Sequence, residues 1–435
     1  MASASYMSKQ LTPDERLYAI VEQGLCIGCG LCQSVAGKER VRVTKTLNGF
    51  LAPVVEGDLD HETVDRIYAV CPGTRVEGLP ERLMEPDTRQ DNVWGPWRRM
   101  VRAWAADPGV RFEGSTGGVM TALGAYLLAS KRVDFILQVK TSASEPTFGE
   151  PTLSFSEADV FEAAGSRYGP AAPLLNINAA LERNQPFAFF AKPCDVAALR
   201  NYAEQDERVD RLVKYCVVMV CGGYGTPRGT HEFFKRMGID PDTVTGLRYR
   251  GRGCPGPTRV DTPSGSHEYH YIDYWGEDET SWTLPFRCKI CPDGIGESAD
   301  IAAADSWIGG GPNRIDSVDD PGSNVLVARS LAGEELIAAA AADGALTLEF
   351  DIPPDTLSVY QPHQVNKKYA AWSRHQGLRD AGRLAPKTAR LRIEELAADL
   401  PEATNRFQRE GTRKRVEAGK ASEPTPQIWK PADAD

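Results

Sequence analysis

The chain has 435 residues, of which 41% are hydrophobic and 25% are charged, a balance typical of a soluble globular protein. A chain of this length exceeds one ordinary hydrophobic core, so two or three domains are expected. The formal net charge of −10 argues against nucleic acid or an anionic membrane as the main partner. The apolar runs are too short for a membrane-spanning helix or the core of a signal peptide, so we expect neither.

The N-terminal region carries cysteines at every third position, Cys26, Cys29 and Cys32, and a fourth, Cys71, followed by Pro72. This spacing lets a short loop cover one face of a [4Fe–4S] cluster, while the fourth ligand comes from elsewhere. Structural zinc sites usually present two separated cysteine pairs, so zinc is the weaker alternative. We therefore predict a [4Fe–4S] cluster on these four thiols. Cysteines at metal-ligand spacing rather than in disulfides favour a reducing compartment, the cytoplasm.

The segment between the cysteine triplet and Cys71 has the pattern of a hairpin. Residues 40–47 and 49–55 alternate in polarity, as half-buried strands do. The stretch that follows, residues 79–96, is acidic and rich in turn residues, which predicts a linker that wraps onto the next domain.

From Arg98 the pattern alternates between helices and buried strands. A helix is expected over residues 119–129, and strands are expected over 133–139, 186–191 and 213–220. Turns with glycine or proline lead from strand to helix. This order predicts a mostly parallel sheet that binds its ligands at the carboxyl ends of the strands.

The remainder of the chain is less regular. Residues 245–285 favour antiparallel pairing, so the predicted fold is α/β, with a mostly parallel sheet core, an N-terminal ferredoxin-like iron–sulfur module and an antiparallel extension. Beyond residue 380 the chain is charged and helical, and we expect its last twenty residues to be disordered. The predicted divisions are a flexible tail (1–15), the iron–sulfur module with its linker (16–95), a catalytic domain (96–380), and a charged C-terminal helix and tail (381–435).

Four further cysteines are predicted to hold a second [4Fe–4S] cluster. Cys288 and Cys291 form a C-x-x-C pair followed by proline, and Cys194 and Cys221 each come just after a predicted strand. Because neighbouring parallel strands end at the same edge of a sheet, the latter two thiols are expected to meet the pair. A zinc site on the same residues is the alternative.

Two cysteines remain outside these sets. Cys216 lies inside a predicted strand and is expected to be a small buried residue. Cys254 has three interpretations that the sequence leaves open: a ligand that replaces one of the second set, a thiol in contact with a flavin, or a loop residue.

Distinctive motifs follow one another in the central domain. In chain order they are Ser115-Thr-Gly-Gly-Val-Met-Thr-Ala-Leu, Gly165-Ser-Arg-Tyr-Gly-Pro, Lys192-Pro-Cys-Asp-Val-Ala-Ala-Leu-Arg, Tyr249-Arg-Gly-Arg-Gly-Cys-Pro-Gly-Pro, and Arg287-Cys-Lys-Ile-Cys-Pro-Asp continuing to Ala299-Asp-Ile-Ala-Ala-Ala-Asp-Ser-Trp307. In this order they resemble the coenzyme F420 hydrogenase/dehydrogenase beta-subunit family. The segment 253–257 looks most like the branch of 7-hydroxymethyl chlorophyll a reductase and ferredoxin-dependent divinyl chlorophyllide 8-vinyl reductase, whereas 306–314 looks more like the wider family.

The resemblance implies FAD together with one or two [4Fe–4S] clusters. A flavin also suits the chemistry, because clusters pass single electrons whereas reduction of a carbon–carbon or carbon–oxygen bond needs two. The backbone at a helix N-terminus suits the FAD pyrophosphate, although the same residues also form ordinary helix caps. The candidate FAD-binding residues are Ser115, Thr116, Gly117, Gly118, Arg167, Tyr168, Lys192, Thr226, Arg250 and Gly253. The candidate proton donors are Asp305, His231 and Tyr168.

These features predict an iron–sulfur flavoprotein reductase. Electrons from reduced ferredoxin, or a similar small carrier, are expected to pass through two clusters to FAD and then, as hydride, to a small organic acceptor. The first alternative is the beta subunit of a larger hydrogenase or dehydrogenase complex, in which FAD exchanges hydride with coenzyme F420. The second alternative is a non-catalytic electron-transfer module. Flavoproteins of this size often self-associate, so a homo-oligomer is a further expectation.

Overall fold

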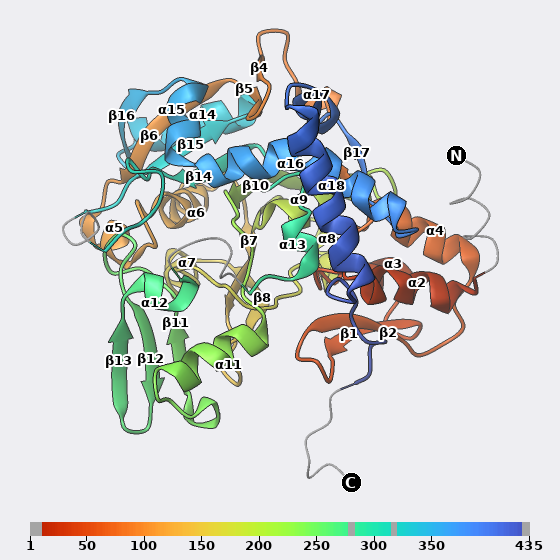
Figure 1. Cartoon of the computed structure of the whole chain (residues 1–435). Helices are drawn as coiled ribbons and strands as arrows, with labels where there is room; N and C mark the ends of the chain where they lie inside the picture. The colour runs from red at the N-terminus through yellow and green to blue at the C-terminus, as the bar shows by residue number, and fades with distance from the viewer. Residues whose placement is uncertain (1–10, 277–282, 315–319, 429–435) are drawn as a thin grey trace.

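An eight-stranded sheet forms the centre of the molecule (Figure 1). The structure is a computed structural model that describes residues 11–276, 283–314 and 320–428. The strands follow the order β16-β6-β15-β14-β10-β9-β7-β8. The four that pair in parallel are β7 (Phe135–Thr141), β9 (Phe187–Ala191), β10 (Val213–Met219) and β14 (Ile301–Asp305). The four that extend the sheet with antiparallel pairing are β8 (Gly149–Ser154), β15 (Asn324–Ala328), β6 (Arg99–Ala105) and β16 (Leu346–Asp351). The predicted parallel core with antiparallel extensions is thereby confirmed.

Helices cover both faces of this sheet. On one face α6 (Val119–Ala129) and α14 (Leu331–Ala342) belong to one hydrophobic cluster with Ala188 and Phe190 of β9, whereas Phe189 of the same strand points to the opposite face. Helix α9 (Pro193–Tyr202) lies on that opposite face and begins with a proline, which suits the first helical position. The predicted helix and three strands of this region are therefore confirmed.

From residue 11 onward, the N-terminal module contains helices and a hairpin. Helices α2 (Pro13–Glu22), α3 (Leu31–Ala36) and α4 (His61–Val70) surround the paired strands β1 (Val41–Lys45) and β2 (Leu51–Val55). The predicted hairpin is confirmed, with Val41 opposite Val55. Thr12 caps α2 in a capping box, so the expected end of the tail at residue 15 falls inside a helix. The ferredoxin-like character of the module stays a prediction.

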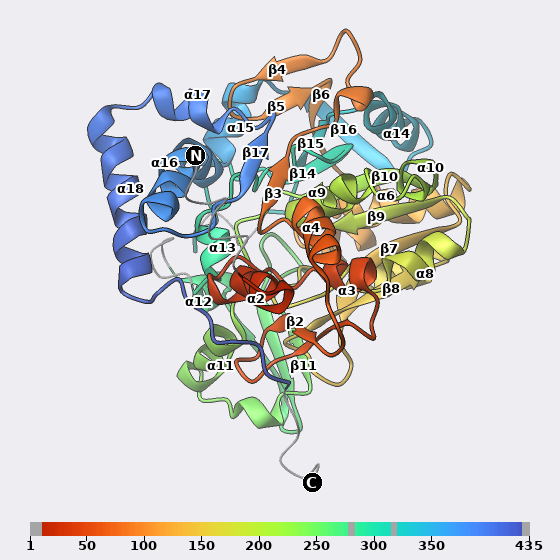
Figure 2. The same ribbon diagram turned by 90° about the vertical axis from the view of Figure 1, so that its right-hand side faces the viewer.

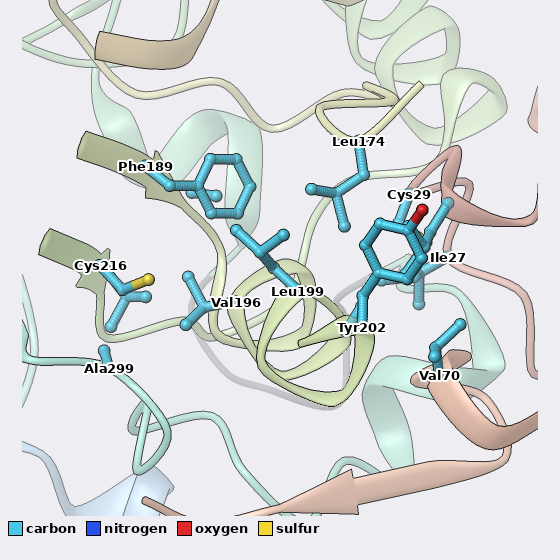
Figure 3. Packing of buried hydrophobic residues seen from close by; sticks show 14 of the residues in the cluster. Ile27, Cys29, Val70, Leu174, Phe189, Val196, Leu199, Tyr202, Cys216 and Ala299 are labelled. Atoms are coloured by element: carbon cyan, nitrogen blue, oxygen red, sulfur yellow. The ribbon is translucent and has the colours of Figure 1, made fainter. Parts of the chain in front are cut away.

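The N-terminal module and the sheet share one hydrophobic core (Figure 3). Val196, Leu199 and Tyr202 of α9 lie in the middle of the view and are at most 4% exposed. On one side they face the sheet at Phe189, and on the other they face the N-terminal module at Val70. The module therefore folds against the sheet rather than as a separate body on a linker.

An antiparallel extension lies at one end of the molecule (Figure 1). It contains the sheet β11 (Gly246–Arg248), β12 (Thr258–Thr262) and β13 (Gly265–Tyr269), with α11 (Pro227–Arg236) and α12 (Tyr271–Trp275) beside it. Its own small core includes the buried Phe233, Phe234 and Tyr249. The antiparallel pairing predicted for residues 245–285 is confirmed within the described part of that range.

The C-terminal region returns to the N-terminal module (Figure 2). Its helices are α16 (Pro362–Asp380), α17 (Ile393–Ala398) and α18 (Glu402–Glu417), and its strand β17 (Lys387–Ala389) pairs in parallel with β3 (Arg75–Glu77). The chain then runs along the hairpin, where Leu47 donates a backbone hydrogen bond of 3.1 Å to Gln427 and Thr46 bridges to Ile428. The expectation of disorder over the last twenty residues is therefore wrong for residues 416–428, because their backbone finds partners on the N-terminal module. Residues 429–435 lie outside the described part.

Short elements complete the described chain. They are η1 (Glu81–Leu83), β4 (Arg89–Asp91), β5 (Gly95–Trp97), α5 (Pro108–Glu113), α7 (Glu157–Glu162), α8 (Ile177–Glu182), α10 (Arg208–Leu212), η2 (Pro241–Thr243), α13 (Phe286–Lys289) and α15 (Pro354–Tyr360). Across the residues that the structure describes, none of the helices combines the length and the apolar character needed to cross a membrane.

Candidate functional site

The first cysteine set comprises Cys26, Cys29, Cys32 and Cys71. The structure brings all four around one small cavity of about 20 Å³, which Pro72 also lines. Cys26 and Cys29 lie on the loop that leads into α3, Cys32 lies in the first turn of that helix, and Cys71 ends α4. This loop turns tightly through glycines with positive φ at positions 28 and 30, where a side chain would collide with neighbouring backbone.

Buried thiols of the first set lie close enough to repel one another when ionised. Burial raises the pKa of Cys26 to about 12, and the neighbouring Cys71 adds to the rise. Backbone N–H groups of Gly28 and Gly73 donate to the Sγ atoms of Cys26 and Cys71, each at 3.4 Å. Four gathered thiols with N–H donors, in a site that disfavours free thiolates, fit a cationic soft-metal group such as an iron–sulfur cluster.

The second cysteine set comprises Cys194, Cys221, Cys288 and Cys291. Cys194 lies in the first turn of α9, Cys221 follows β10, and the remaining two belong to α13 and the turn after it. Burial raises the pKa of Cys194 well above its usual value, and the charges of Cys221 and Cys291 contribute to the rise. Cys288 likewise lies near Cys221 and Cys291. The structure therefore brings the predicted set together at the carboxyl edge of the parallel strands.

The two sets differ from a site for a single ion. Within the described ranges, no group of three or more His, Cys, Asp or Glu side chains has an arrangement that would hold one metal ion. In a [4Fe–4S] cluster each thiolate binds a different iron, so the four sulfurs lie farther apart than around one ion. Each set brings four thiols together, the number that a [4Fe–4S] cluster requires. Their ligand roles stay predictions.

The two other cysteines lie apart from the second set. Cys216 is completely buried in β10 and packs in the shared core, as expected for a small apolar residue. Cys254 lies beside Arg250, Asp305 and Asp320, and burial raises its pKa to about 12. None of these neighbours is a cysteine of the second set, so the position favours a loop residue over a replacement ligand.

A cavity of about 970 Å³ lies at the carboxyl ends of β9, β10 and β14, beside the N-terminus of α6. It also reaches the second cysteine set, because Cys221 lines it. Eight predicted cofactor or proton-donor residues lie on its wall: Ser115, Thr116, Gly118, Arg167, Tyr168, Lys192, Arg250 and Asp305. This is the sheet edge at which the sequence predicts ligand binding.

Four predicted residues are not among the described residues that line the cavity. The N–H of Gly117 donates to Oδ1 of Asn324 at 2.9 Å, which ties α6 to β15. Thr226 caps α11 by accepting from the N–H of Gly229, and His231 lies within that helix. The N–H of Gly253 donates to the carbonyl of Phe112 at 3.3 Å. These contacts favour structural roles.

A buried polar network links Arg250, Asp305 and Thr116 on the cavity wall. The guanidinium of Arg250 donates to Oδ2 of Asp305 at 2.8 Å and to the hydroxyl of Thr116 at 2.7 Å. That hydroxyl donates in turn to Oδ1 of Asp305 at 2.5 Å. Arg250 also lies over the rings of Tyr271 and Trp307, at 5.2 and 5.3 Å from their centroids. Because both oxygens of Asp305 accept hydrogen bonds, the network favours Asp305 as an anchor rather than as a proton donor.

Arg167 presents a buried cation to the same cavity. Its guanidinium donates to the carbonyls of Ser166 and Ala164, at 3.1 and 2.9 Å, and its Nε has no hydrogen-bond partner. Burial lowers the pKa of Arg167 to about 10, and the nearby charge of Arg248 adds to this effect. A buried guanidinium with unused donor capacity fits an anionic ligand. Together with the N-terminus of α6, it fits the pyrophosphate of a dinucleotide.

Aromatic side chains line the remaining wall, and sequence reasoning missed most of them. Tyr271, Trp275 and Trp307 join the predicted Tyr168, whose ring meets Trp275 edge to face at 4.9 Å. Such rings suit a planar ligand. The aromatic-rich segment 271–275 was a usable signal. His363, whose pKa burial lowers to about 4, also lines the cavity, but a lone histidine in a helix gives no signal.

The fold and these groupings are those of an α/β oxidoreductase component. Models of the coenzyme F420 hydrogenase/dehydrogenase beta subunit match residues 100–178 with the N-terminal part and residues 185–351 with the C-terminal part. The two matches cover more than half of the chain. The chain therefore belongs to the coenzyme F420 hydrogenase/dehydrogenase beta-subunit family, as the motifs predict.

Two similar proteins are beta subunits of F420-dependent formate dehydrogenases. The chain is 27% identical over 210 residues to subunit beta of formate dehydrogenase 1 from Methanococcus maripaludis, covering 48% of this chain and 52% of the relative. It is 32% identical over 130 residues to the subunit from Methanocaldococcus jannaschii, covering 30% and 34%. The chain thus spans about half of the first relative and a third of the second.

A similar fold occurs in a solved structure of the F420-reducing [NiFe] hydrogenase complex from Methanosarcina barkeri. The TM-score is 0.52 at 18% sequence identity, and the match covers 66% of this chain and 95% of the other. At this identity the similarity concerns the fold alone.

Proposed function

We propose that this protein is the beta subunit of a larger oxidoreductase complex, in which FAD in the large cavity exchanges hydride with coenzyme F420 and both cysteine sets hold [4Fe–4S] clusters. The observation that carries the proposal is the position of Cys221, which belongs to the second cysteine set and also lines the cavity. The FAD site, which handles two electrons, and the second cluster, which handles one, would then lie on either side of the same cavity wall. FAD would supply the conversion between hydride and single electrons.

The residues of the cavity divide into three tasks in this proposal. Arg167 and the backbone around Ser115 and Gly118 would hold the pyrophosphate. The aromatic wall would orient flat rings and exclude water. Of the predicted proton donors, Asp305 is held by the Arg250 network, whereas Tyr168 lies on the cavity wall outside that network. The hydroxyl of Tyr168 lies 3.4 Å from that of Tyr271, so Tyr168 would be the proton donor.

The comparisons favour this function over the ferredoxin-dependent reductase that the sequence first indicates. Both similar proteins are subunits of F420-dependent formate dehydrogenases, and the family is that of coenzyme F420 hydrogenase/dehydrogenase beta subunits. Family membership supports an oxidoreductase role over the non-catalytic module. A cytoplasmic location stays a prediction.

The first experiment is anaerobic purification of the full chain, with iron, sulfide and flavin quantified per chain. We expect roughly eight irons and one FAD, as two [4Fe–4S] clusters and a flavin require. Reduced coenzyme F420 should then bleach the flavin within the mixing time of a rapid-kinetics experiment. Zinc without flavin would overturn the proposal.

A matched pair of variants tests the flavin site. Arg167→Met removes the buried cation from the cavity and should reduce FAD retention by about tenfold, the scale of one charge-assisted bidentate contact. Arg252→Met removes a guanidinium whose side chain is 37% exposed and which pairs with Glu113, and it should retain FAD. Equal FAD content in the two variants would contradict the role of Arg167.

A ferredoxin-dependent reductase is the second candidate, and one observation favours it. The first cysteine set lies in residues 26–71, outside the two matched family segments. An additional cluster outside the shared fold would give the chain its own entry point for single electrons. Flavin reduction by reduced ferredoxin, in the absence of any partner subunit and without a response to coenzyme F420, would support this candidate instead.

A further inference from the structure

Two carboxylic side chains lie near the first cysteine set. Asp195 is completely buried, and its charge acts on Cys29. Its Oδ1 atom has no hydrogen-bond partner, so this carboxylate is not fully compensated. Glu423, on the C-terminal segment, faces Cys26 across a small cavity that both residues line.

One cation opposes these carboxylates. Arg287 is 1% exposed, and its charge acts on Cys71. Its guanidinium is held by the carbonyl of Pro72, at 2.7 and 3.1 Å. The balance around the first set is therefore one cation against two carboxylates, or against Asp195 alone where Glu423 is protonated.

The second cysteine set has a predominantly cationic surrounding. Lys192 ion-pairs with Oδ2 of Asp195 at 2.6 Å, and its charge also acts on Cys194 and Cys221. Lys367, on α16, donates to the carbonyl of Gly222 at 3.4 Å, directly after Cys221.

The charges of two lysines act on Cys288. Lys367 acts on this thiol as well as on Cys221, and Lys289 is its direct neighbour in α13. Three lysines therefore surround the second set, opposed by Asp195, which acts on Cys194. This excess of cations holds whatever the charge of Glu423.

Asp195 and Lys192 together form an oriented ion pair between the two sets. The carboxylate of Asp195 lies near Cys29 of the first set and Cys194 of the second. The ammonium of Lys192, in contrast, acts on Cys194 and Cys221, which both belong to the second set. An added electron is stabilised by nearby cations and destabilised by nearby carboxylates, most strongly in a buried region of low dielectric. The pair thus lowers the energy of an electron on the second set relative to the first.

We propose that the charged side chains around the two cysteine sets order the reduction potentials of their clusters, so that the second cluster is the better electron acceptor. One electron leaves a reduced first cluster and reduces an oxidised second cluster, without a proton or a further reactant. This inference rests on the proposed function, which supplies the clusters. It adds a direction, because an electron on the first cluster moves inward to the wall of the large cavity.

The experiment is a potentiometric titration of the anaerobic full chain, followed by electron paramagnetic resonance. Lys367→Met removes the ammonium but keeps the length of the side chain, and it should lower the potential of the second cluster alone. Glu423→Gln removes the carboxylate near the first set and should raise the potential of the first cluster alone. Each change should alter the electron distribution between the clusters by about tenfold, which is about 59 mV for one electron.

Controls assign the signals and test the charge itself. Lys367→Arg keeps the charge and should leave both potentials unchanged. Cys71→Ala removes a ligand of the first set, and the signal that survives is that of the second cluster. Should that variant fail to fold, Cys291→Ala removes a ligand of the second set, and the signal that survives is that of the first cluster.

The outcomes separate this inference from the proposed function. A wild-type second cluster with the higher potential, together with opposite shifts in the two charge variants, would support the ordering. Two intact clusters with the reverse order, or a Lys367→Met variant with unchanged potentials, would overturn the inference and leave the proposed function standing. A wild-type chain without two clusters would overturn both.

Discussion

The two cysteine sets are built in opposite ways. The first takes three of its four cysteines from seven consecutive residues, 26–32, and a helix end supplies Cys71. The second collects its cysteines from residues 194–291, from the ends of β9 and β10 and from a short helix that follows the antiparallel extension. A local motif therefore defines the first set, whereas the topology of the sheet defines the second.

The surroundings of the two sets also differ, because the first lies beside a hydrophobic core and the second beside a cavity. The first set adjoins the core that the N-terminal module shares with α9, and Cys29 itself is 8% exposed within that core. The second set opens onto the large cavity through Cys221. In the proposed function, the first set would thus serve as an electron relay and the second would exchange electrons with the ligand in the cavity.

The strongest test of this comparison removes one ligand from each set. Cys71→Ala and Cys291→Ala should each lower the iron content from roughly eight to roughly four per chain. The first variant should keep direct flavin reduction by coenzyme F420, whereas the second should lose electron transfer between the flavin and the first cluster. Iron analysis and rapid absorption spectroscopy measure both effects.

Cys216→Ala is the control for these changes, because it removes a cysteine from the core of β10. It should keep roughly eight irons and cost about 1 kcal/mol of unfolding free energy, the scale of one small buried group. Loss of iron from this variant, or full iron in either ligand variant, would contradict the assignment of the sets.

The shared core supports a second prediction, on cooperativity. Leu199→Ala in α9 removes a completely buried side chain between the N-terminal module and the sheet, and it should lower the unfolding free energy by about 3 kcal/mol. Chemical denaturation should show one transition for both regions, with the Trp94 fluorescence and the cluster absorbance lost together.

Leu47→Ala is the matched control, because this leucine is 62% exposed and the change should stay within about 0.5 kcal/mol. Two separate transitions in the wild type would show that the N-terminal module folds on its own, as the sequence-based division at residue 95 implies.

The predicted domain boundary at residue 95 illustrates what the sequence alone cannot predict. Periodicity predicts α6, β9 and β10 because each is long and strongly apolar. The spacing of Cys26, Cys29 and Cys32 predicts the first set because the ligands are local. The packing of α9 against two regions leaves no local pattern, since its apolar residues look alike whichever partner they contact.

The lining of the cavity also divides into residues that local patterns predict and residues that only long-range packing brings there. The residues at the carboxyl ends of strands, such as Lys192 and Cys221, are predictable from the topology of a parallel sheet. Tyr271, Trp307 and His363 come from the antiparallel extension, a loop and α16. Only the folded chain brings these three together, because no pattern in one segment records its contacts with another.

A third prediction concerns the wall of the cavity. Arg250→Met leaves Asp305 without its cation and should lower the unfolding free energy by about 2 kcal/mol, less than for a fully buried pair because Asp305 is 25% exposed. Thermal and chemical denaturation measure this loss. Arg252→Met, which breaks a more exposed ion pair with Glu113, should stay within about 0.5 kcal/mol.

The smallest predicted effect is the pH dependence of stability that arises from His375, which contacts the second cysteine set's turn. His375 of α16 is completely buried, and its Nε2 lies 3.0 Å from the carbonyl of Ile290, in the turn between Cys288 and Cys291. Burial lowers the pKa of His375 to about 3, although the hydrogen bond with Ile290 opposes this effect. The folded protein therefore holds a neutral imidazole with Nε2–H as donor.

The unfolded chain binds a proton at His375 near its ordinary pKa of about 6.5, whereas the folded chain does not until about pH 3. The stability that this residue contributes is thus present above pH 6.5 and is lost as the pH falls toward 3. Between pH 7 and 5.5 the loss should be about 1 kcal/mol. His375→Gln keeps a donor for Ile290 but has no proton to bind, so denaturation curves should show a shallower decline over this range. At pH 8 the unfolding free energies of the two proteins should differ only through the altered contact with Ile290. An equal decline in both proteins at lower pH would exclude His375 as the source of the pH dependence.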